Sequence, residues 1–194
     1  MASKIRARIL QQSIACFSEK GYAGTSTKDI SKRADVTEGS LFRLFESKEK
    51  LFREALDSVI ATGLSTEKFD KLLANPDFKK AIRGALWALY SKQTKESLRF
   101  LSYAMLENGE HIDEIIKPIA AKRVRSIEKR IRVAIKEGHV RRGIDAEGAA
   151  ASLYATVGDL RFRAVLVESA KKEQVKRLHQ CLELWFRGVL TPRG

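Results

Sequence analysis

The chain has 194 residues and a net charge of +13, with 44% hydrophobic and 31% charged side chains, as in an ordinary globular protein long enough to bury a real core. The positive charge favours a polyanionic partner. No apolar run approaches the roughly 18 residues of a membrane span, the N-terminus lacks the apolar region of a secretory signal, and two distant cysteines favour a reduced, cytoplasmic setting over a disulfide scaffold.

The first predicted helix runs from about Lys4 to Lys20. Ile5, Ile9 and Phe17 recur at helical spacing, and Gly21 follows as a C-terminal cap. This helix has one apolar face and needs neighbours to cover it.

Two short helical patterns then follow, separated by a tight turn. Ser26 is suited to cap the first, which carries Ile30 and Ala34 on one face. The pattern stops at Asp35, and Thr37 can cap the second helix, Glu38 to Phe45. Two short helices joined in this way are typical of a helix-turn-helix, whose second helix enters the major groove of DNA.

In the second short helix Leu41 and Phe45 face inward together. Ser47 caps the next helix, which begins at Lys48 and is predicted to run to about Gly63. We expect this fourth helix to act as the lever between the two halves of the chain.

The residues at these positions resemble the N-terminal signature of the TetR family of bacterial transcriptional regulators. The resemblance covers about a third of the chain. The matching residues are Phe17, Gly21, Tyr22, Ser26, Ile30, Ser31, Ala34, Val36, Thr37, Gly39, Ser40, Leu41, Phe42, Phe45, Lys48 and Leu51. It implies a DNA-binding domain at residues 1–62, a ligand-binding and dimerisation domain at residues 63–194, and two reading heads about 34–36 Å apart on a palindromic operator.

Three positions depart from the family pattern. Asp35 replaces the usual turn glycine, and Asp tolerates left-handed backbone better than most residues. Phe42 stands where the family usually has a phosphate-binding Tyr, and Leu44 stands where His is common. Two phosphate contacts of the family are therefore missing.

The predicted DNA-binding residues divide into those that hold the backbone and those that read bases. Arg43 can take a guanine bidentately, Gly39 permits close approach to the groove, and Phe42 either presses on a sugar or thymine methyl or is core. Lys48 places a cation and a helix N-terminus beside a phosphate. The full set is Ser26, Thr27, Lys28, Thr37, Gly39, Ser40, Phe42, Arg43 and Lys48.

The rest of the chain is helical in pattern, without convincing period-two alternation, so the sequence predicts an all-α protein. Further helices are predicted from Asn75-Pro76, from Thr94 to Asn108, from Pro118 to about Glu137, from Ala146 to about Ser169, and from Lys171 to Leu190.

The predicted helix from Pro118 carries a basic stripe, because ten basic and only two acidic residues lie between Lys117 and Arg142. Cations at helical spacing form one face, with Arg123 and Arg130 beside it. The stripe consists of Lys122, Arg125, Lys129, Arg132 and Lys136. Two interpretations stay open: a solvated helix face, or an anion site for a phosphate-bearing effector or an acidic partner.

In the second half, two groups of residues have predicted roles. The effector pocket that the resemblance implies is assigned to Tyr90, Phe100, Tyr103, Met105 and Glu107, which mix aromatic surface with polar tips. The family pairs its last two helices across a dimer, and the residues assigned to that interface are Ala151, Ala155, Gly158, Leu178, Leu182 and Trp185.

No catalytic motif, metal-ligand spacing or phosphate loop is present, so the sequence predicts no enzyme, no metal and no cofactor. The predicted function is a ligand-responsive repressor that binds double-stranded DNA as a homodimer, releases it on binding a small molecule, and has no membrane partner. One alternative is a helical small-molecule or acyl-carrier binding protein with a vestigial helix-turn-helix. Another is a TetR-like protein that binds DNA, responds to no ligand, and works through a protein partner bound at the basic stripe.

Overall fold

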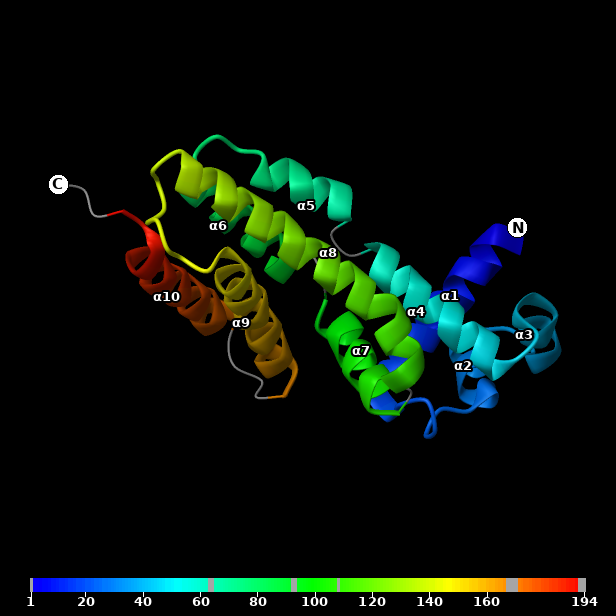
Figure 1. The fold of residues 1–194 in the computed structure, drawn as a ribbon. Coiled ribbons are helices and arrows are strands. Elements are labelled where there is room, and N and C mark those ends of the chain that lie inside the picture. Colours follow the sequence, from blue (N-terminus) through cyan, green and yellow to red (C-terminus); the bar gives the residue numbers. More distant parts are fainter. Residues whose placement is uncertain (1, 63–64, 92–93, 108, 167–170, 192–194) are drawn as a thin grey trace. The chain divides into compact units, whose positions relative to one another are not determined.

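The computed structural model describes residues 2–62, 65–91, 94–107, 109–166 and 171–191 (Figure 1). Within these ranges the regular structure is helical, apart from an isolated antiparallel bridge between Val140 and Leu190. The helices are α1 (Ala2–Lys20), α2 (Thr27–Arg33), α3 (Glu38–Phe45), α4 (Lys48–Thr62), α5 (Thr66–Leu73), α6 (Phe78–Ser91), α7 (Lys95–Glu107), α8 (Gly109–Lys136), α9 (Ala146–Leu166) and α10 (Lys171–Val189). The prediction of an all-α protein is confirmed.

The chain divides into two compact units. The first unit comprises residues 1–63 and 94–113, and the second comprises residues 64–93 and 114–194. Helix α7 therefore packs with α1 to α4, although it lies in the second half of the sequence. The functional division into residues 1–62 and 63–194 stays a prediction.

A cluster of aromatic rings holds the first unit together. Phe17 of α1, Tyr22, Phe52 of α4 and Phe100 of α7 have ring centroids between 5.0 and 6.1 Å apart. Three of the contacts are edge-to-face, the geometry that the quadrupoles of aromatic rings favour. This cluster joins α7 to the base of the helix-turn-helix.

The turn after α1 depends on a glycine and a distant carboxylate. Gly21 has φ of +72°, which side chains rarely adopt, and a Cβ there would collide with the carboxylate of Glu107. The Glu107 carboxylate accepts hydrogen bonds from the backbone N–H groups of Tyr22 and Ala23, at 2.5 and 3.3 Å. Glu107 thus satisfies two backbone donors of the turn that follows α1.

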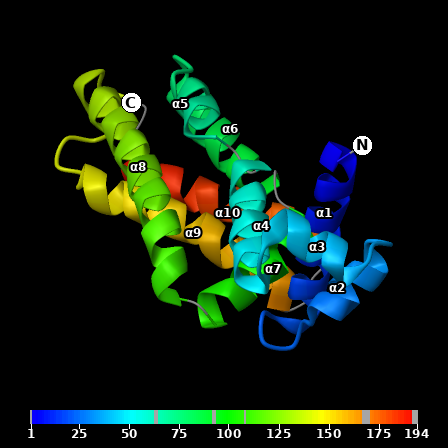
Figure 2. The same cartoon turned by 90° about the vertical axis from the view of Figure 1, so that its right-hand side faces the viewer.

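The second unit packs α5, α6, α9 and α10 with the part of α8 from Glu114 onward around one apolar core. In both views α9 lies beside α10 (Figures 1 and 2). The buried Tyr90 hydroxyl donates to the side-chain oxygen of Gln174 at 2.6 Å. Arg130 of α8 donates to the carbonyls of Asn75 and Pro76, so it ties the α5–α6 loop to this core.

Two predicted helix starts are wrong, because neither Pro76 nor Pro118 occupies the first position of its helix. Helix α6 begins after Asp77, whose carboxylate accepts from the Lys80 N–H at 3.0 Å, and Pro76 lies in the preceding turn. Helix α8 begins at Gly109 and contains Pro118 in its interior. Three predicted helix ends, at Gly63, Asn108 and Ser169, lie outside the described residues.

Candidate DNA-binding surface

Helix α2 is stabilised at its start by the capping residue Ser26 and by an ion pair. The Ser26 hydroxyl accepts from the Asp29 N–H at 3.0 Å, as the sequence predicted. Lys20 approaches the Asp29 carboxylate to 3.1 Å, and hydrogen bonds from Lys20 and Ser26 hold the pKa of this carboxyl below its usual range. Ile30 is buried, so the exposed side of α2 is fixed.

The turn between α2 and α3 takes the left-handed conformation that the sequence predicted. Asp35 has φ of 50°, which costs a non-glycine residue some strain. Arg8 of α1 donates to the Asp35 carbonyl at 3.2 Å, and the Val36 N–H donates to the Ser31 carbonyl at 3.0 Å. These bonds hold the turn in place of the glycine that the family usually has.

Helix α3 buries Leu41 and Phe45 and leaves its other side open (Figure 2). Its cap is Thr37, whose hydroxyl accepts from the Ser40 N–H at 3.2 Å. Phe42 keeps 42% of its surface exposed, which removes the interpretation of this residue as core. Arg43 is also exposed.

Gly39 lies at the start of α3 and has open space around it. A Cβ at this position would meet within 4 Å only the Thr37 hydroxyl oxygen, at 4.0 Å, so packing within the chain does not demand a glycine. The missing side chain instead leaves the backbone bare on the outer side of the helix. That is the property expected where a second molecule approaches closely.

The predicted DNA-binding residues outside α3 differ in whether their side chains are free or bonded within the chain. Lys28 is exposed, whereas the Thr27 hydroxyl donates to Glu38 at 2.7 Å. Lys48 places its ammonium 4.2 Å from the centre of the Tyr22 ring, a cation–π distance. Glu38 is therefore held by α2, and Lys48 rests on an aromatic ring at the start of α4.

The junction between α3 and α4 holds a strained residue that no sequence pattern indicates. Glu46 has φ of 60° and ψ of −43°, and the Ser47 N–H donates to the Phe45 carbonyl at 2.6 Å. A bond between residues two apart around such a backbone is the rare positive-φ γ-turn. It turns the chain sharply, and Ser47 then caps α4 by accepting from the Lys50 N–H at 3.1 Å.

The predicted effector residues are divided between the two units. Tyr90 belongs to the second unit, whereas the other four lie on α7 in the first. Phe100 is fully buried in the aromatic cluster, and the Glu107 carboxylate accepts from the turn after α1. The assignment of all five residues to an effector pocket stays a prediction.

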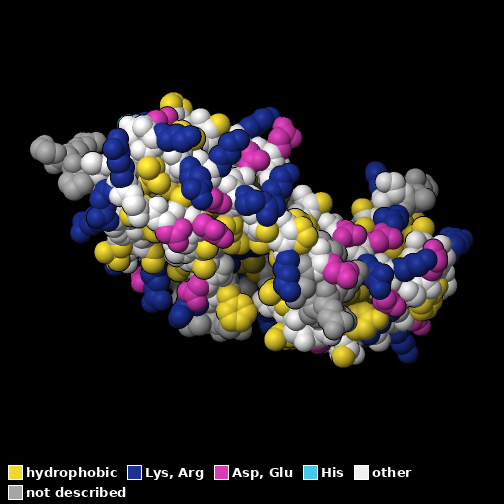
Figure 3. All heavy atoms as spheres, in the orientation of Figure 1, with side chains coloured by type: hydrophobic (Ala, Val, Ile, Leu, Met, Phe, Trp, Pro, Cys, Tyr) yellow, Lys and Arg dark blue, Asp and Glu magenta, His cyan; other side chains and the backbone are white. Residues whose placement is uncertain are grey.

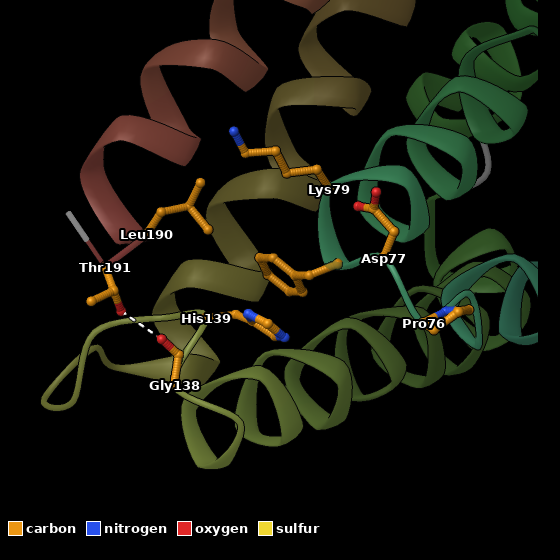
Figure 4. A pocket seen from close by; sticks show the side chains of 8 residues that line it. Pro76, Asp77, Lys79, Gly138, His139, Leu190 and Thr191 are labelled. Atoms are coloured by element: carbon orange, nitrogen blue, oxygen red, sulfur yellow. Dashed lines mark hydrogen bonds between the residues drawn. The ribbon is translucent and has the colours of Figure 1, made fainter. Parts of the chain in front are cut away.

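A hollow of about 720 Å³ lies within the second unit (Figure 4). The residues that line it are Pro76, Asp77, Phe78, Lys79, Gly138, His139, Leu190 and Thr191. Two of its polar side chains bond within the chain: the Asp77 carboxylate caps α6, and the Thr191 hydroxyl donates to the Gly138 carbonyl at 2.9 Å. Lys79 and His139 also line the hollow.

The basic stripe faces outward on α8 (Figure 3). Ile127 and Ile131 are buried on the opposite face, as predicted. Arg132 pairs with Glu128 at 2.6 Å, and Arg130 turns away from the stripe into the loop before α6. Lys122, Arg125, Lys129 and Lys136 are exposed along the helix, and so is the paired Arg132.

The predicted dimer residues fall into two classes. Ala151, Ala155 and Gly158 are exposed along one face of α9, and Phe162 continues that face with half its surface exposed. No wall of the second unit covers this stripe of small residues. It fits the prediction of close approach by another helix.

On α10 the prediction needs correction. Leu178 and Leu182 are buried in the core of the second unit, and Trp185 packs on Phe78 and Phe186. The surface of Leu178 and Leu182 is thus buried within one chain, whereas Trp185 stays partly exposed and its place in the dimer interface stays a prediction. The outer face of α10 carries Cys181, Leu184 and Gly188 instead, and Leu184 has 67% of its surface exposed.

Two further observations concern kinds of site. Among the described residues no three His, Cys, Asp or Glu side chains gather as metal ligands would. In the same ranges no helix combines the length and the apolarity that a bilayer crossing requires.

Comparison with known proteins agrees with this geometry. The profile of bacterial regulatory proteins of the tetR family matches residues 9–55. The negative transcriptional regulator IcaR of the icaADBC biofilm operon in Staphylococcus epidermidis is 32% identical over 83 residues, which are 43% of this chain and 42% of IcaR. The chain thus spans about two fifths of the length of that curated relative.

Solved structures match over nearly the whole chain. NalD of Pseudomonas aeruginosa, the secondary repressor of the MexAB-OprM efflux pump, has a TM-score of 0.76 and 22% identity, with 100% of both chains covered. A cysteine mutant of the regulator CifR in complex with a 26-base-pair operator DNA has a TM-score of 0.69 and 20% identity, covering 92% of this chain and 95% of CifR. The matched profile falls on the helix-turn-helix, so residues 9–55 are similar to the DNA-binding region of the tetR family of bacterial regulatory proteins, and the full chain shares the fold of these solved structures.

Proposed function

We propose that this protein is a ligand-responsive transcriptional repressor, which binds a palindromic operator as a homodimer and leaves it when a small molecule binds. The observation that carries the proposal is the outer side of α3. Leu41 and Phe45 anchor the helix in the core, and Phe42 and Arg43 stand free at its surface. A capped helix that is anchored on one side and exposes Arg43 on the other is what major-groove reading requires.

The same geometry weighs against a vestigial DNA-binding head. A helix-turn-helix that had lost its role would have no need for its capping residues or for the bonds that hold its turn. Here Ser26, Thr37 and Ser47 each cap a helix, and Arg8 holds the strained Asp35. Phe42 and Leu44 lack the phosphate contacts of the family pattern, which changes how the DNA backbone is bound. The caps and the turn of the helix-turn-helix do not depend on these two residues.

The proposed dimer rests on the exposed faces of α9 and α10. Ala151, Ala155 and Gly158 permit close helix contact, and Phe162 and Leu184 supply apolar area beside them. A self-complementary face of this kind generates a two-fold dimer, and a two-fold dimer reads a palindrome. CifR is seen in complex with operator DNA, and IcaR is named a negative transcriptional regulator. Their similarity to this chain supports the proposal.

Release by a ligand requires differential binding. The effector must bind the DNA-incompetent arrangement of the two heads better than the DNA-binding one, since equal affinity for both would move nothing. Such a protein acts on the chromosome, and we place it with the chromosome in the cytoplasm, without a catalytic role.

The test is selection from a pool of random double-stranded DNA by the full chain at low and moderate salt. The wild type should enrich a palindrome. Arg43→Ala should lose about 1–3 kcal/mol of discrimination at one base pair of each half-site, because a bidentate contact to guanine is removed. Arg53→Ala is the matched control, since Arg53 is exposed on α4 and paired with Glu49.

Enrichment of no sequence by the wild type would overturn the proposal. Equal losses in the Arg43 and Arg53 variants would show that charge alone, and not base reading by α3, accounts for binding.

A further inference from the structure

Helices α6 and α10 face each other in the second unit, and a hollow of about 390 Å³ lies between them. Its volume falls within the range of about 300–1,000 Å³ that is usual for small-molecule sites. The side-chain pairs that join the two helices are Arg83 with Glu183, Trp87 with His179, and Tyr90 with Gln174. The residues that line the hollow are Arg83, Gly84, Trp87, Leu178, His179 and Leu182.

Trp87 contributes an indole ring to this hollow. It keeps 40% of its surface exposed, although indole is one of the side chains that gain most from burial. Its ring centre lies 6.5 Å from the imidazole of His179 and 5.9 Å from the ring of Tyr90. Tyr90 is buried and its hydroxyl donates to Gln174 at 2.6 Å, so the ring that Trp87 packs against is fixed. Trp87 is therefore an exposed aromatic ring that is already held in place, which lowers the entropic cost of binding.

The rest of the lining is mostly apolar. Leu178 and Leu182 are buried core residues of α10. Gly84 adds no side chain, and a Cβ there would meet within 4 Å only Leu72, at 3.9 Å, so packing within the chain does not demand a glycine. Glycine inside a helix is unfavourable relative to alanine. Apolar walls and bare backbone beside an exposed indole suit a flat, apolar ring.

The charges beside the hollow favour an anionic ligand over a cationic one. His179 also lines a neighbouring hollow of about 630 Å³ together with Lys172 and Lys176, which are both exposed. Glu173 lines this second hollow too, but its carboxylate lies 3.4 Å from the Nε of Arg177. Three cations against one carboxylate make this end of α10 positive.

The hollow and the proposed dimer face lie on different sides of α10. Successive residues of an α-helix are turned by about 100°, so His179 and Cys181 point to nearly opposite sides. Cys181 and Leu184 belong to the exposed outer face of the helix. A second chain that packs on that outer face therefore approaches α10 from the side away from His179.

We propose that the hollow between α6 and α10 binds a planar aromatic acid, whose ring stacks on Trp87 and whose carboxylate lies towards Lys172 and Lys176. The ring is selected by the indole and the apolar walls, and the charge by the two lysines. This inference goes beyond the proposed function, because it assigns a ligand site that does not depend on DNA binding.

The test uses the full chain labelled with 5-fluorotryptophan. The chain has two tryptophans, so its fluorine NMR spectrum has two signals, and Trp185→Phe identifies the signal of Trp87. Addition of 2-naphthoate should shift the Trp87 signal to a saturating value through the ring current of the stacked naphthalene, and should leave the Trp185 signal in place.

Two matched probes separate the ring from the charge. Decahydro-2-naphthoate keeps the carboxylate without the aromatic ring and should cause no saturable shift. The neutral 2-naphthamide keeps the ring without the charge and should bind about fivefold more weakly than 2-naphthoate, since it loses its attraction to exposed lysines.

Variants titrated with 2-naphthoate by calorimetry locate the two contacts. Trp87→Leu removes the stacking surface and should weaken binding by roughly fivefold or more. Lys172→Met combined with Lys176→Met should weaken it by about fivefold. Lys68→Met combined with Lys71→Met removes two exposed lysines of α5 that line neither hollow, and should bind as the wild type does.

An unmoved Trp87 signal, equal movement of both signals, an equal shift with the saturated acid, or undiminished affinity in Trp87→Leu would overturn the inference. Equal affinity for the acid and the amide would overturn the assignment of an anionic ligand. If Trp87→Leu does not fold, the spectra of the wild type with the three probes decide the question. Because no measurement uses DNA, failure here leaves the proposed regulator standing, and failure of DNA selection leaves this site standing.

Discussion

Phe42 and Arg43 are neighbours on the outer side of α3 with different tasks. Arg43 carries a charge and a hydrogen-bonding fork, whereas Phe42 offers only an exposed apolar ring. Most relatives that the sequence resembles have Tyr at the position of Phe42, and its hydroxyl binds a phosphate. At this residue a single oxygen atom separates the chain from the family pattern.

We predict that Phe42→Tyr strengthens operator binding by about 0.5–1.5 kcal/mol, the net value of one new hydrogen bond. Because a phosphate carries no sequence information, affinity should rise equally for the selected operator and for unrelated DNA. Titration of both DNAs by fluorescence anisotropy measures this. A gain limited to the operator would mean that Phe42 reads a base.

At the scale of turns and helices, Glu46 stores strain between α3 and α4. We predict that Glu46→Gly stabilises the protein by about 1 kcal/mol, because glycine adopts positive φ without a steric penalty, and the gain is reduced by the loss of the Glu46–Lys50 ion pair. Glu49→Gly, three residues later inside α4, should destabilise it by about 0.5–1 kcal/mol. Urea unfolding measures both, and destabilisation by both variants would contradict the γ-turn.

Ion pairs between α1 and α2 make the first unit sensitive to acid. Hydrogen bonds from Arg33 to Glu19, at 2.6 and 2.9 Å, lower the pKa of this carboxyl from its ordinary 4.5. A carboxyl with a lowered folded-state pKa stabilises the fold above its unfolded pKa, and this stabilisation is lost as the pH falls through the folded value.

We therefore predict that stability is level from pH 7 to about 5 and declines below about pH 4.5, and that Glu19→Gln flattens this acid limb. Glu96→Gln, at an exposed carboxylate of α7, should leave the limb unchanged. Urea midpoints measured from pH 3 to 7 give the answer. Identical acid limbs for the wild type and Glu19→Gln would refute the role of this pair.

Sequence patterns were sufficient for the elements whose signals are local. The caps at Ser26, Thr37 and Ser47 and the buried pair Leu41 and Phe45 are predictable because capping and helical spacing operate within a few residues. The γ-turn at Glu46 was not, since nothing in its side chain reports a positive φ.

Tertiary choices were also beyond the local pattern. The spacing of Leu178, Leu182 and Phe186 predicts one shared apolar face, but only packing decides that this face is buried within the chain rather than against a second chain. Glu107 lies far along the chain from Tyr22 and Ala23, whose N–H groups it accepts. Such long-range pairs leave no mark in a single sequence.

At the scale of the whole molecule, the proposed dimer depends on the outer face of α10. We predict that Leu184→Glu makes the protein monomeric and weakens operator binding at least tenfold, because each chain would place an uncompensated carboxylate in the interface. Leu72→Glu, a partly exposed leucine on α5, is the matched control and should leave the dimer intact. Sedimentation at micromolar concentration measures both, and a dimer in both variants would place the interface elsewhere.

The central claim is that two α3 helices, held by one dimer, read two half-sites about one turn of DNA apart. The most direct measurement compares the selected operator with the same operator after insertion of five base pairs at its centre, which rotates one half-site to the opposite side of the duplex. We predict that the affinity for the lengthened DNA falls to that of an isolated half-site. Equal affinity for both DNAs would contradict the account.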